Sequence, residues 1–276
     1  MSLSLARVFY LGDRYHGSQW QPNVRTIQGE LIDALHNWSK ETHSPQTVQL
    51  SGRTDKGVHS LGQLVLIETD MPIDLNRINE FLPEDIVLWA TANVADGFKP
   101  RYDVLMRHYR YYMPLNETDI DLISMRKAVE FLIGSHDFSN FSKPDGDRET
   151  TTTILNVHFQ IHQNICVFDI FGTNFLWKLV RKMITLLLEI GAKKYDYTIA
   201  KDLIENKRGI KGGITPAPPE GLILIEAAVP FRFEPCKYAI RRIRKEISER
   251  SDFMSRMSAS LTSLTNDFFF DRRIPF

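Results

Sequence analysis

The sequence predicts an α+β fold built from two halves that share one order of elements, β-α-β-β-α-β. Two observations support this prediction. Short β-branched and apolar runs alternate with longer segments of helical periodicity, and the same order recurs after about residue 100. The chain has 276 residues, 43% of them hydrophobic and 25% charged, which is ordinary globular composition. That length can form one large domain or two of ordinary size.

The first predicted half covers residues 1–100. Thr26 is suited to cap its first helix and Asp74 its second, because an oxygen at this position accepts hydrogen bonds from the free N–H groups of the first turn. The expected elements are, in order, a buried strand at 5–12, a helix at 26–41, two strands at 47–53 and 62–69, a short helix at 75–82 and a strand at 86–94.

The second predicted half covers residues 101–234. Gly134 and Gly191 are placed to end two of its helices. The expected elements are a strand at 103–113, a helix at 121–134, strands at 153–161 and 164–172, an apolar helix at 174–191, an added helix at 198–207 and a closing strand at 222–229. Because this order is that of the ferredoxin-like unit, we expect two ferredoxin-like halves. Residues 235–276 form a mostly polar C-terminal extension with helical character.

Charge and cysteine content exclude several classes of protein. The chain has 34 basic residues (Lys and Arg) and 34 acidic residues (Asp and Glu), so its formal net charge is zero. A zero net charge disfavours a protein that coats nucleic acid, but it is compatible with a local basic patch. Two cysteines are too few for a disulfide framework. The N-terminus lacks the pattern of a signal peptide, and no apolar run approaches the roughly 18 residues of a spanning helix. We therefore expect a soluble cytoplasmic protein.

The turn between the strands at 47–53 and 62–69 concentrates charge around Asp55. Gly52 and Gly57 allow a tight, exposed turn, and Arg53 and Lys56 are the close cationic neighbours of the carboxylate. One interpretation is a nucleophile, whose ionised form nearby cations favour. The other is a turn aspartate that bonds nearby amides, and spacing alone favours this second interpretation.

Arg181 lies in the apolar segment 174–191, on the same side of the predicted helix as Trp177 and Leu188. A buried arginine needs a carboxylate partner or a cleft, because an unpaired buried charge is costly. The alternative is a side chain whose head group reaches water, and the sequence does not decide between the two.

Basic and aromatic residues alternate in GFKPRYDVLMRHYRYY, residues 97–112. Such alternation suits a groove that contacts phosphates and stacks bases, although an amphipathic strand with buried tyrosines explains it slightly better by itself. In the extension, one helix face can contact phosphates or simply face solvent. That face comprises Lys237, Arg241, Arg244 and Lys245. We find no phosphate-binding glycine loop, no CxxC pair and no HExxH motif, so no metal or organic cofactor is expected.

The segment GRTDKGVHSLGQ, residues 52–63, closely resembles the GRTDxGVHxxGQ signature of tRNA pseudouridine synthases of the TruA family. Other segments agree in order: RHYRYY is similar to the family's RxYRY strand, HDFSNF to its xDFxxF loop, NFLWKLVRKMI to its xFxxxMVRxxx helix and PEGLILIEAAV to its closing strand. The resemblance covers roughly residues 5–230 and leaves out the C-terminal extension.

The resemblance implies isomerisation of uridine to pseudouridine in the anticodon stem-loop of tRNA by a homodimer, without metal or organic cofactor. It implies a continuous mixed sheet formed by both halves, with helices on one side and a central cleft. Asp55 would be the nucleophile, Arg181 would pair with it and Tyr109 would take the proton from C5 or stack on the base. Arg53 would help to displace the nucleotide from its stack, which costs a few kcal/mol.

Further expected RNA contacts are Lys56, His59, Tyr15, Gln21, Arg107 and Arg110. The chain departs from the family in its first loop, YLGDRYHGSQWQ in place of YDGSxYxGWQ, and at Leu176, Trp177 and Lys178, which replace a His-rich stretch. Two other functions remain open. One is a catalytically silent RNA-binding protein on this scaffold. The other is a carboxylate-dependent hydrolase of nucleosides or glycosides, which would normally need a second acidic residue.

Overall fold

The computed structural model describes residues 2–115, 120–143 and 149–264. Its first part follows the expected order and consists of β1 (Ser2–Tyr10), α1 (Ile27–Ser39), β2 (Val48–Leu50), β3 (His59–Thr69), α2 (Leu75–Glu80) and β4 (Ile86–Asn93). The Thr26 side chain accepts from the N–H of Gly29 at the start of α1, and Asp74 accepts from the first turn of α2. Both predicted caps are confirmed.

The second part adds five strands and three helices to the described structure. They are β5 (Met106–Pro114), α3 (Leu122–Leu132), β6 (Gly134–Asp137), β7 (Thr151–His162), β8 (Ile165–Gly172), α4 (Leu179–Gly191), α5 (Ile199–Ile204) and β9 (Leu222–Ala228). A short strand, β10 (Glu234–Pro235), and the long helix α6 (Lys237–Leu264) follow.

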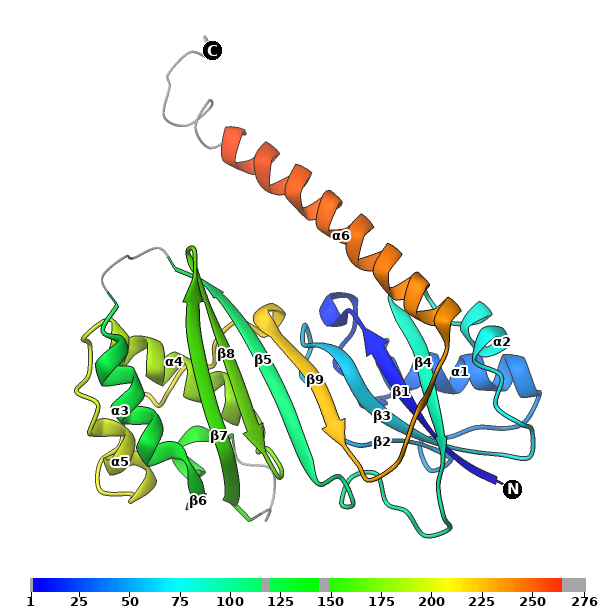
Figure 1. Ribbon diagram of the computed structural model, residues 1–276, viewed down its shortest axis with the longest axis horizontal. Helices are drawn as coiled ribbons and strands as arrows, with labels where there is room; N and C mark the ends of the chain where they lie inside the picture. Colours follow the sequence, from blue (N-terminus) through cyan, green and yellow to red (C-terminus); the bar gives the residue numbers. More distant parts are fainter. Residues whose placement is uncertain (1, 116–119, 144–148, 265–276) are drawn as a thin grey trace.

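One mixed sheet connects both parts, in the order β10-β4-β1-β3-β9-β5-β8-β7-β6, with β2 paired to β3 (Figure 1). The two parts meet where β3 and β9 run parallel, through the pairs His59–Ile223 and Ser60–Leu224. A side chain at Gly62 would lie 2.3 Å from the carbonyl oxygen of Ile225. The second glycine of GVHSLGQ is therefore required for the close approach of the two strands.

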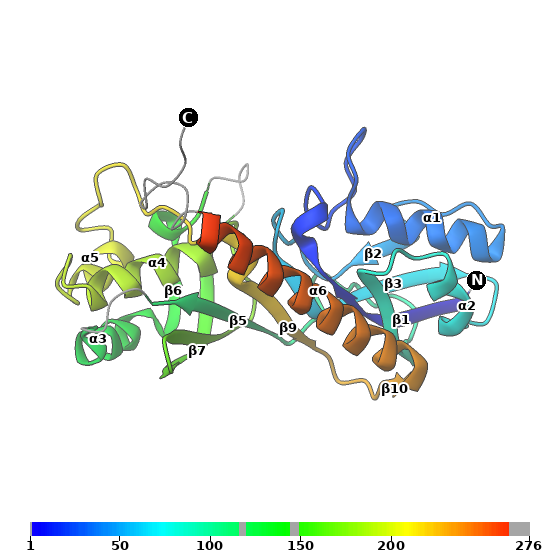
Figure 2. The same cartoon turned by 90° about the horizontal axis from the view of Figure 1, so that it is seen from above.

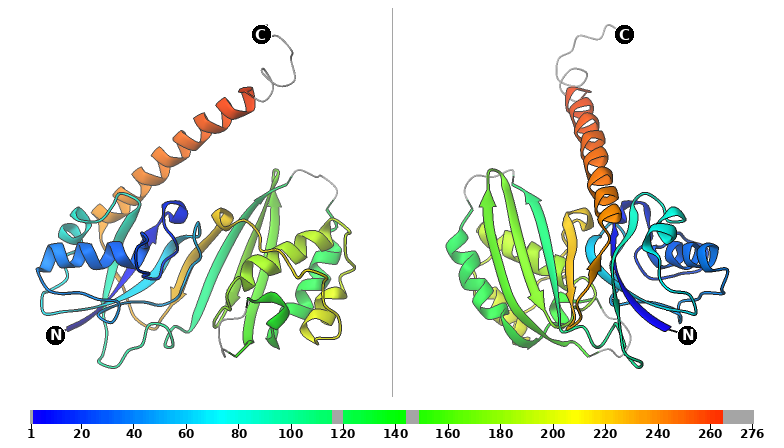
Figure 3. Two further views of the ribbon diagram at one scale, coloured as in Figure 1. Left: turned by 180° about the vertical axis from the view of Figure 1, so that it is seen from behind. Right: turned by 45° about the vertical axis from the view of Figure 1, so that its right-hand side comes forward.

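Helices α1 and α4 lie on the same side of the sheet, as the view from above and the view from behind both show (Figures 2 and 3). Helices α1 and α2 cover β1 and β3 through one apolar cluster, which includes Val8, Leu31 and Ile78. A second cluster joins α3, α4 and α5 to β5, β7 and β8 and includes Met125, Phe168 and Met183. The predicted α+β class is confirmed, whereas the ferredoxin-like description of each half stays a prediction.

Helix α6 packs on the other face of the sheet through its first turns, and farther along the helix Arg250 pairs with Asp13 at 2.9 Å. Ala239 and Ile243 bury themselves against Phe9 and Val87 of the sheet. The guanidinium of Arg242 donates to the carbonyl oxygens of three residues around the end of α2, which are Asn79, Leu82 and Pro83. The rest of the helix projects away from the sheet (Figures 1 and 3).

Several predicted boundaries are wrong for backbone reasons. The apolar helix begins at Leu179 and not at 174, because Lys178 adopts a left-handed conformation with φ of 68°. The end of helix α3 is confirmed, because Ile133 is the C-cap and Gly134 follows it with φ of 116°, and Gly134 also begins the unpredicted strand β6. Strand β5 begins at Met106 rather than at 103. Apolar periodicity does not reveal such single-residue turns.

Candidate active site

A cleft of about 1150 Å³ lies where the two parts of the sheet meet. Its walls come from the loop before α1, the turn before β3, the start of β5 and the segment between β8 and α4. Of the predicted site residues, seven line it: Asp55, Arg181, Tyr109, Arg53, Lys56, Gln21 and Arg107. The fold therefore gathers residues that are up to 160 positions apart in the sequence, such as Gln21 and Arg181.

Asp55 is presented by a turn that the rest of the fold holds on both sides. Gly57 has φ of 88° and donates its N–H to the carbonyl of Gly12 at 3.1 Å. The N–H of Thr54 donates to Ser18 Oγ at 2.8 Å, and the N–H of Ser18 donates to the Thr54 carbonyl at 3.1 Å. Because these bonds fix the backbone before and after Asp55, the direction of its carboxylate is set by the fold.

Both oxygens of the Asp55 carboxylate accept hydrogen bonds from distant residues. Arg181 Nη1 lies 2.6 Å from Oδ2, and Trp177 Nε1 lies 2.9 Å from Oδ1. The side chains of Asp55 and Arg181 are only 23% and 12% exposed, so this ion pair is largely shielded from water. These partners come from α4 and the residue that precedes its N-cap, and not from nearby amides. The interpretation of Asp55 as a turn aspartate that bonds its neighbours is therefore wrong.

Arg181 is a buried arginine with defined partners. Besides the carboxylate, its Nε donates to the carbonyl of Ala217 at 2.6 Å, and its own carbonyl accepts from the N–H of Ala217 at 3.1 Å. The head group therefore meets a carboxylate inside the cleft, and the alternative of a side chain reaching out to water does not hold.

Tyr109 lies in the cleft with 7% of its surface exposed and packs edge-to-face on Phe175, at 5.2 Å between ring centroids. Burial raises the pKa of the Tyr109 phenol above its ordinary value of about 10, so the hydroxyl is neutral at physiological pH. Tyr109 can therefore offer a ring face or a neutral hydroxyl to a bound base.

Arg107 lines the cleft, but its guanidinium is engaged by the protein. It donates to the carbonyls of Thr173 and Ser51 at 2.7 Å each and to that of Arg101 at 3.0 Å. This residue joins three segments of the cleft wall. Arg53 and Lys56 are exposed in the cleft lining, as is Gln21, whose Nε2 donates to the carbonyl of His16 at 3.1 Å.

The structure does not bring Tyr15, His59 or Arg110 to the cleft lining. Tyr15 is fully buried, and its hydroxyl donates to Asp85 Oδ1 at 2.5 Å. His59 Nδ1 accepts from the N–H of Gly12 at 3.0 Å, and burial lowers the pKa of His59. Neither arrangement leaves the side chain available to the cleft.

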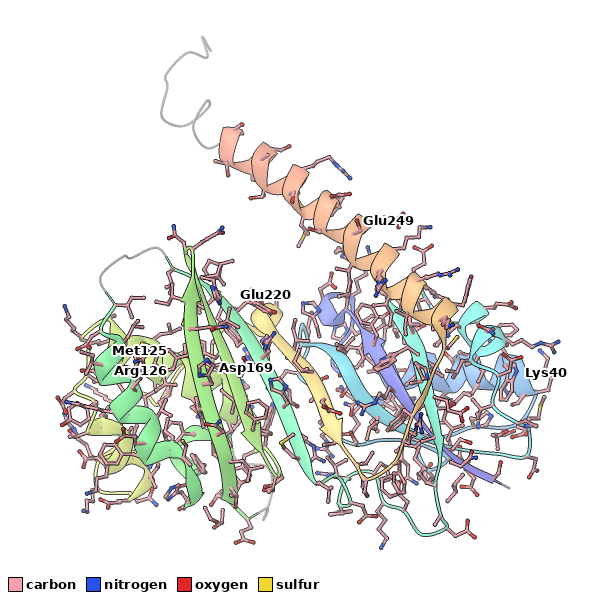
Figure 4. All side chains as sticks on the ribbon, viewed as in Figure 1. Lys40, Met125, Arg126, Asp169, Glu220 and Glu249 are labelled. Carbon is pink, nitrogen blue, oxygen red and sulfur yellow. The ribbon has the colours of Figure 1, made fainter. Side chains whose placement is uncertain are left out.

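Arg110 lies outside the cleft because its guanidinium is turned to a carboxylate on the other face of the sheet. It binds both carboxylate oxygens of Asp169, at 2.8 and 3.1 Å, and Asp169 also bonds His108 at 2.5 Å (Asp169 is labelled in Figure 4). Successive side chains of a strand point to opposite faces. Arg110 therefore faces away from the side on which Tyr109 lines the cleft. The basic and aromatic alternation is partly that of an amphipathic strand.

Trp177 is the site residue that the sequence did not identify as a partner of Asp55. The signals were its position at a departure from the family pattern and its place on the same side of the predicted helix as Arg181, four residues earlier. Among the described residues, no group of three or more His, Cys, Asp or Glu could hold a metal ion. Across the same part of the chain, no helix has the length and apolar character needed to cross a membrane.

Comparison with known proteins identifies the family of this chain. A family model described as tRNA pseudouridine synthase matches residues 128–230. The chain is 38% identical over 246 residues to tRNA pseudouridine synthase A of Archaeoglobus fulgidus, covering 88% of this chain and 90% of that protein. It is 36% identical over 255 residues to the protein of that name from Methanothermobacter thermautotrophicus, covering 91% of each.

A solved structure, the archaeal box H/ACA sRNP Nop10-Cbf5 complex, aligns with 67% of this chain and 43% of that chain, at 10% identity and a TM-score of 0.35. That similarity is too low to support an argument about this fold. The extent and identity of the sequence matches are sufficient by themselves, and this chain belongs to the tRNA pseudouridine synthase family.

Proposed function

We propose that the protein isomerises uridine to pseudouridine in the anticodon stem-loop of tRNA, with Asp55 as the nucleophile. The observation that carries this proposal is the Asp55 carboxylate, which Arg181 and Trp177 hold at both oxygens inside a cleft of about 1150 Å³. A cleft of this size has room for a nucleotide that has left its stack.

The reaction needs a carboxylate next to the sugar and the base. The C1′–N1 bond breaks and a C1′–C5 bond forms, while C5 loses a proton and N1 gains one, so the product is an isomer of the substrate. A carboxylate can add to the sugar or to C6 and leave again, as in other glycosyl transfers. Arg181 stabilises the negative charge of Asp55 when the bound RNA excludes water from the cleft.

Tyr109 and Arg53 act on the displaced nucleotide in this proposal. The raised pKa of Tyr109 disfavours the phenolate that would be needed to remove the C5 proton, so Tyr109 contacts the base through its ring or its neutral hydroxyl. Arg53 is exposed in the lining of the cleft, where its charge can replace contacts that the uridine loses on leaving the helix. Lys56 and Gln21 extend this contact surface.

The exposed basic residues of α6 support a further contact with the RNA backbone. Lys237, Arg241, Arg244 and Lys245 are all exposed, whereas Arg242, between them, is used to bind the end of α2. The proposal includes a homodimer and a reaction without metal or organic cofactor, both from the family resemblance, and a cytoplasmic location, which rests on the cysteine content and the patterns of the sequence. Residues 1–100, 101–234 and 235–276 are proposed as two halves and an extension, of which 265–276 lie outside the described residues.

A hydrolase is the less favoured function. Of the described residues that line the cleft, Asp55 is the single acidic one, whereas glycosidases normally use two carboxylates. A catalytically silent RNA-binding protein would have the same cleft but would not turn over its substrate. The tritium-release assay below distinguishes it from the enzyme.

The deciding measurement is tritium release from tRNA labelled at C5 of uridine. The wild-type protein should release tritium and Asp55→Asn should not. The matched control is Asp169→Asn, which removes a bonded carboxylate on the opposite face of the sheet and should keep the rate. No release by the wild type from any tRNA would contradict the enzyme proposal. A full rate in Asp55→Asn would contradict the nucleophile assignment alone.

A further inference from the structure

Trp177 contributes a hydrogen bond to the proposed nucleophile from a position just outside helix α4. Its indole Nε1 donates to Asp55 Oδ1 at 2.9 Å, and Trp177, which lines the cleft, is 39% exposed. Lys178, with φ of 68° and ψ of 0°, turns the chain between Trp177 and the helix. Left-handed backbone at a residue other than glycine is uncommon and concentrates at functional sites.

Two lysine ammonium groups lie close to the indole ring of Trp177. Lys143 Nζ lies 4.4 Å from the centroid of the ring, and Lys178 Nζ lies 5.7 Å from it. The N–H of Lys143 also donates to the Trp177 carbonyl at 3.1 Å. An ammonium over a tryptophan face is attractive, so these contacts favour the ring orientation in which the N–H donates to Asp55.

Two donors on different oxygens constrain a carboxylate more than one does. With Arg181 alone on Oδ2, the Asp55 carboxylate could still rotate about its Cβ–Cγ bond. The Trp177 bond to Oδ1 fixes the plane of the group. Each carboxylate oxygen has two acceptor positions, so one bond from the protein leaves each oxygen able to reach a substrate.

We propose that Trp177 is a positioning residue that holds Asp55 in the orientation needed for attack. The inference rests on the proposed function, because it assigns Trp177 a part in the same reaction. The geometry also allows a different part, in which the exposed indole stacks on the displaced base. Stacking would strengthen RNA binding, whereas positioning acts on the chemical step.

The experiment separates kcat from KM in the tritium-release assay. Trp177→Phe keeps the aromatic ring and removes the N–H, and Trp177→His and Trp177→Gln each restore an N–H donor. The matched control is Trp89→Phe, which removes an indole bond to the carbonyl of Leu61 outside the cleft. Melting temperatures of all variants show whether the fold is intact.

Positioning predicts that Trp177→Phe lowers kcat at least about tenfold, because hydrogen bonds to charged groups are among the stronger ones. Its KM should stay within about twofold, since the bond is made inside the protein. At least one of the His and Gln variants should recover much of kcat, and Trp89→Phe should retain both constants. A full kcat in Trp177→Phe, a raised KM with unchanged kcat, or no recovery in either donor variant would each overturn the inference.

A second measurement keeps this inference separate from the proposed function. The emission that Trp177→Phe removes from the wild-type spectrum belongs to Trp177, and the same difference can be measured in an Asp55→Ala background. The two difference spectra should be distinct, because Asp55→Ala deletes the acceptor of the indole. Identical spectra would refute the bond itself, even if tRNA is never modified by the wild-type protein.

Discussion

The ion pair of Asp55 and Arg181 gives the sharpest test of how the cleft is built. Arg181→Met keeps an unbranched side chain of similar length and removes the charge. It deletes the 2.6 Å bond to Asp55 Oδ2 and the 2.6 Å bond to the Ala217 carbonyl. Asp55 then keeps only the Trp177 bond in a cleft that shields most of its side chain.

The magnitude follows from the shielding of the pair. Removing one partner of a fully buried ion pair costs about 3–5 kcal/mol, because the remaining charge is left unpaired. The Asp55 side chain is 23% exposed, so water compensates part of that loss. We expect a loss of about 2–3 kcal/mol in the free energy of unfolding, including the bond to Ala217. For a chain of this size, the melting temperature should fall by about 5–10 °C.

The assay is chemical denaturation of the wild type, Arg181→Met, Asp55→Asn and the double variant. The two single losses should not add, and the coupling between the sites should be about 1–3 kcal/mol. The matched control is Arg110→Met, which breaks the ion pair with Asp169 on the opposite face. It should lower stability while tritium release from tRNA continues at the wild-type rate. Additive losses in the cycle, or a drop below about 0.5 kcal/mol for Arg181→Met, would refute the reasoning.

Four further results are expected. Tyr109→Phe keeps the aromatic ring against Phe175 and should retain kcat within about threefold. The reason is that the raised pKa of the Tyr109 phenol disfavours a phenolate base. A hundredfold loss of kcat would show that the hydroxyl is essential. Burial alone would raise the pKa of Asp169, but hydrogen bonds from Arg110 and His108 lower it overall. The ionised carboxylate therefore contributes its full stability above pH of about 4, and this contribution is lost as the pH falls below that value. Acid titration of stability should therefore be flatter in Asp169→Asn, and identical curves would contradict this. Replacing Lys237, Arg241, Arg244 and Lys245 with Gln should lower the slope of log Kd for tRNA against log salt concentration by up to about 3. The turnover rate of RNA that is already bound should not change. An unchanged slope would exclude α6 from the contact with RNA. Gly57→Ala should destabilise the protein by more than Gly97→Ala. Both glycines have positive φ, but a side chain at position 57 would also lie 2.9 Å from Pro219 Cγ. Equal losses in the free energy of unfolding would argue against that clash.

Most helices and strands could be predicted from the sequence, because capping residues and apolar periodicity act within each element. Thr26 and Asp74 cap the helices that follow them, as side-chain oxygens at those positions do. The alternation of basic and aromatic residues slightly favoured a strand with buried tyrosines, and Tyr109 and Tyr111 are indeed buried. The turn signature around Asp55 identified the candidate nucleophile through its resemblance to a family rather than through spacing.

The partners of each polar group depended on contacts between segments far apart in the chain. Sequence alone placed Tyr15, Arg107 and Arg110 together as RNA contacts. The structure ties Tyr15 to Asp85, Arg107 to three carbonyls and Arg110 to Asp169. Which face of a strand lines a cleft is decided by packing against other elements, and periodicity cannot specify it.

The segment around Trp177 shows both what the sequence determined and what only the tertiary structure decided. Its apolar neighbours predicted a continuous helix, and the sequence did determine that a helix carries Arg181 into the core. The left-handed turn at Lys178 delays the start of that helix to Leu179, so Trp177 lies outside it, and its indole reaches Asp55, 122 positions away. The sequence determined the groups available for chemistry, and the tertiary structure decided which of them meet, because a hydrogen bond requires distances and directions that only the folded chain sets.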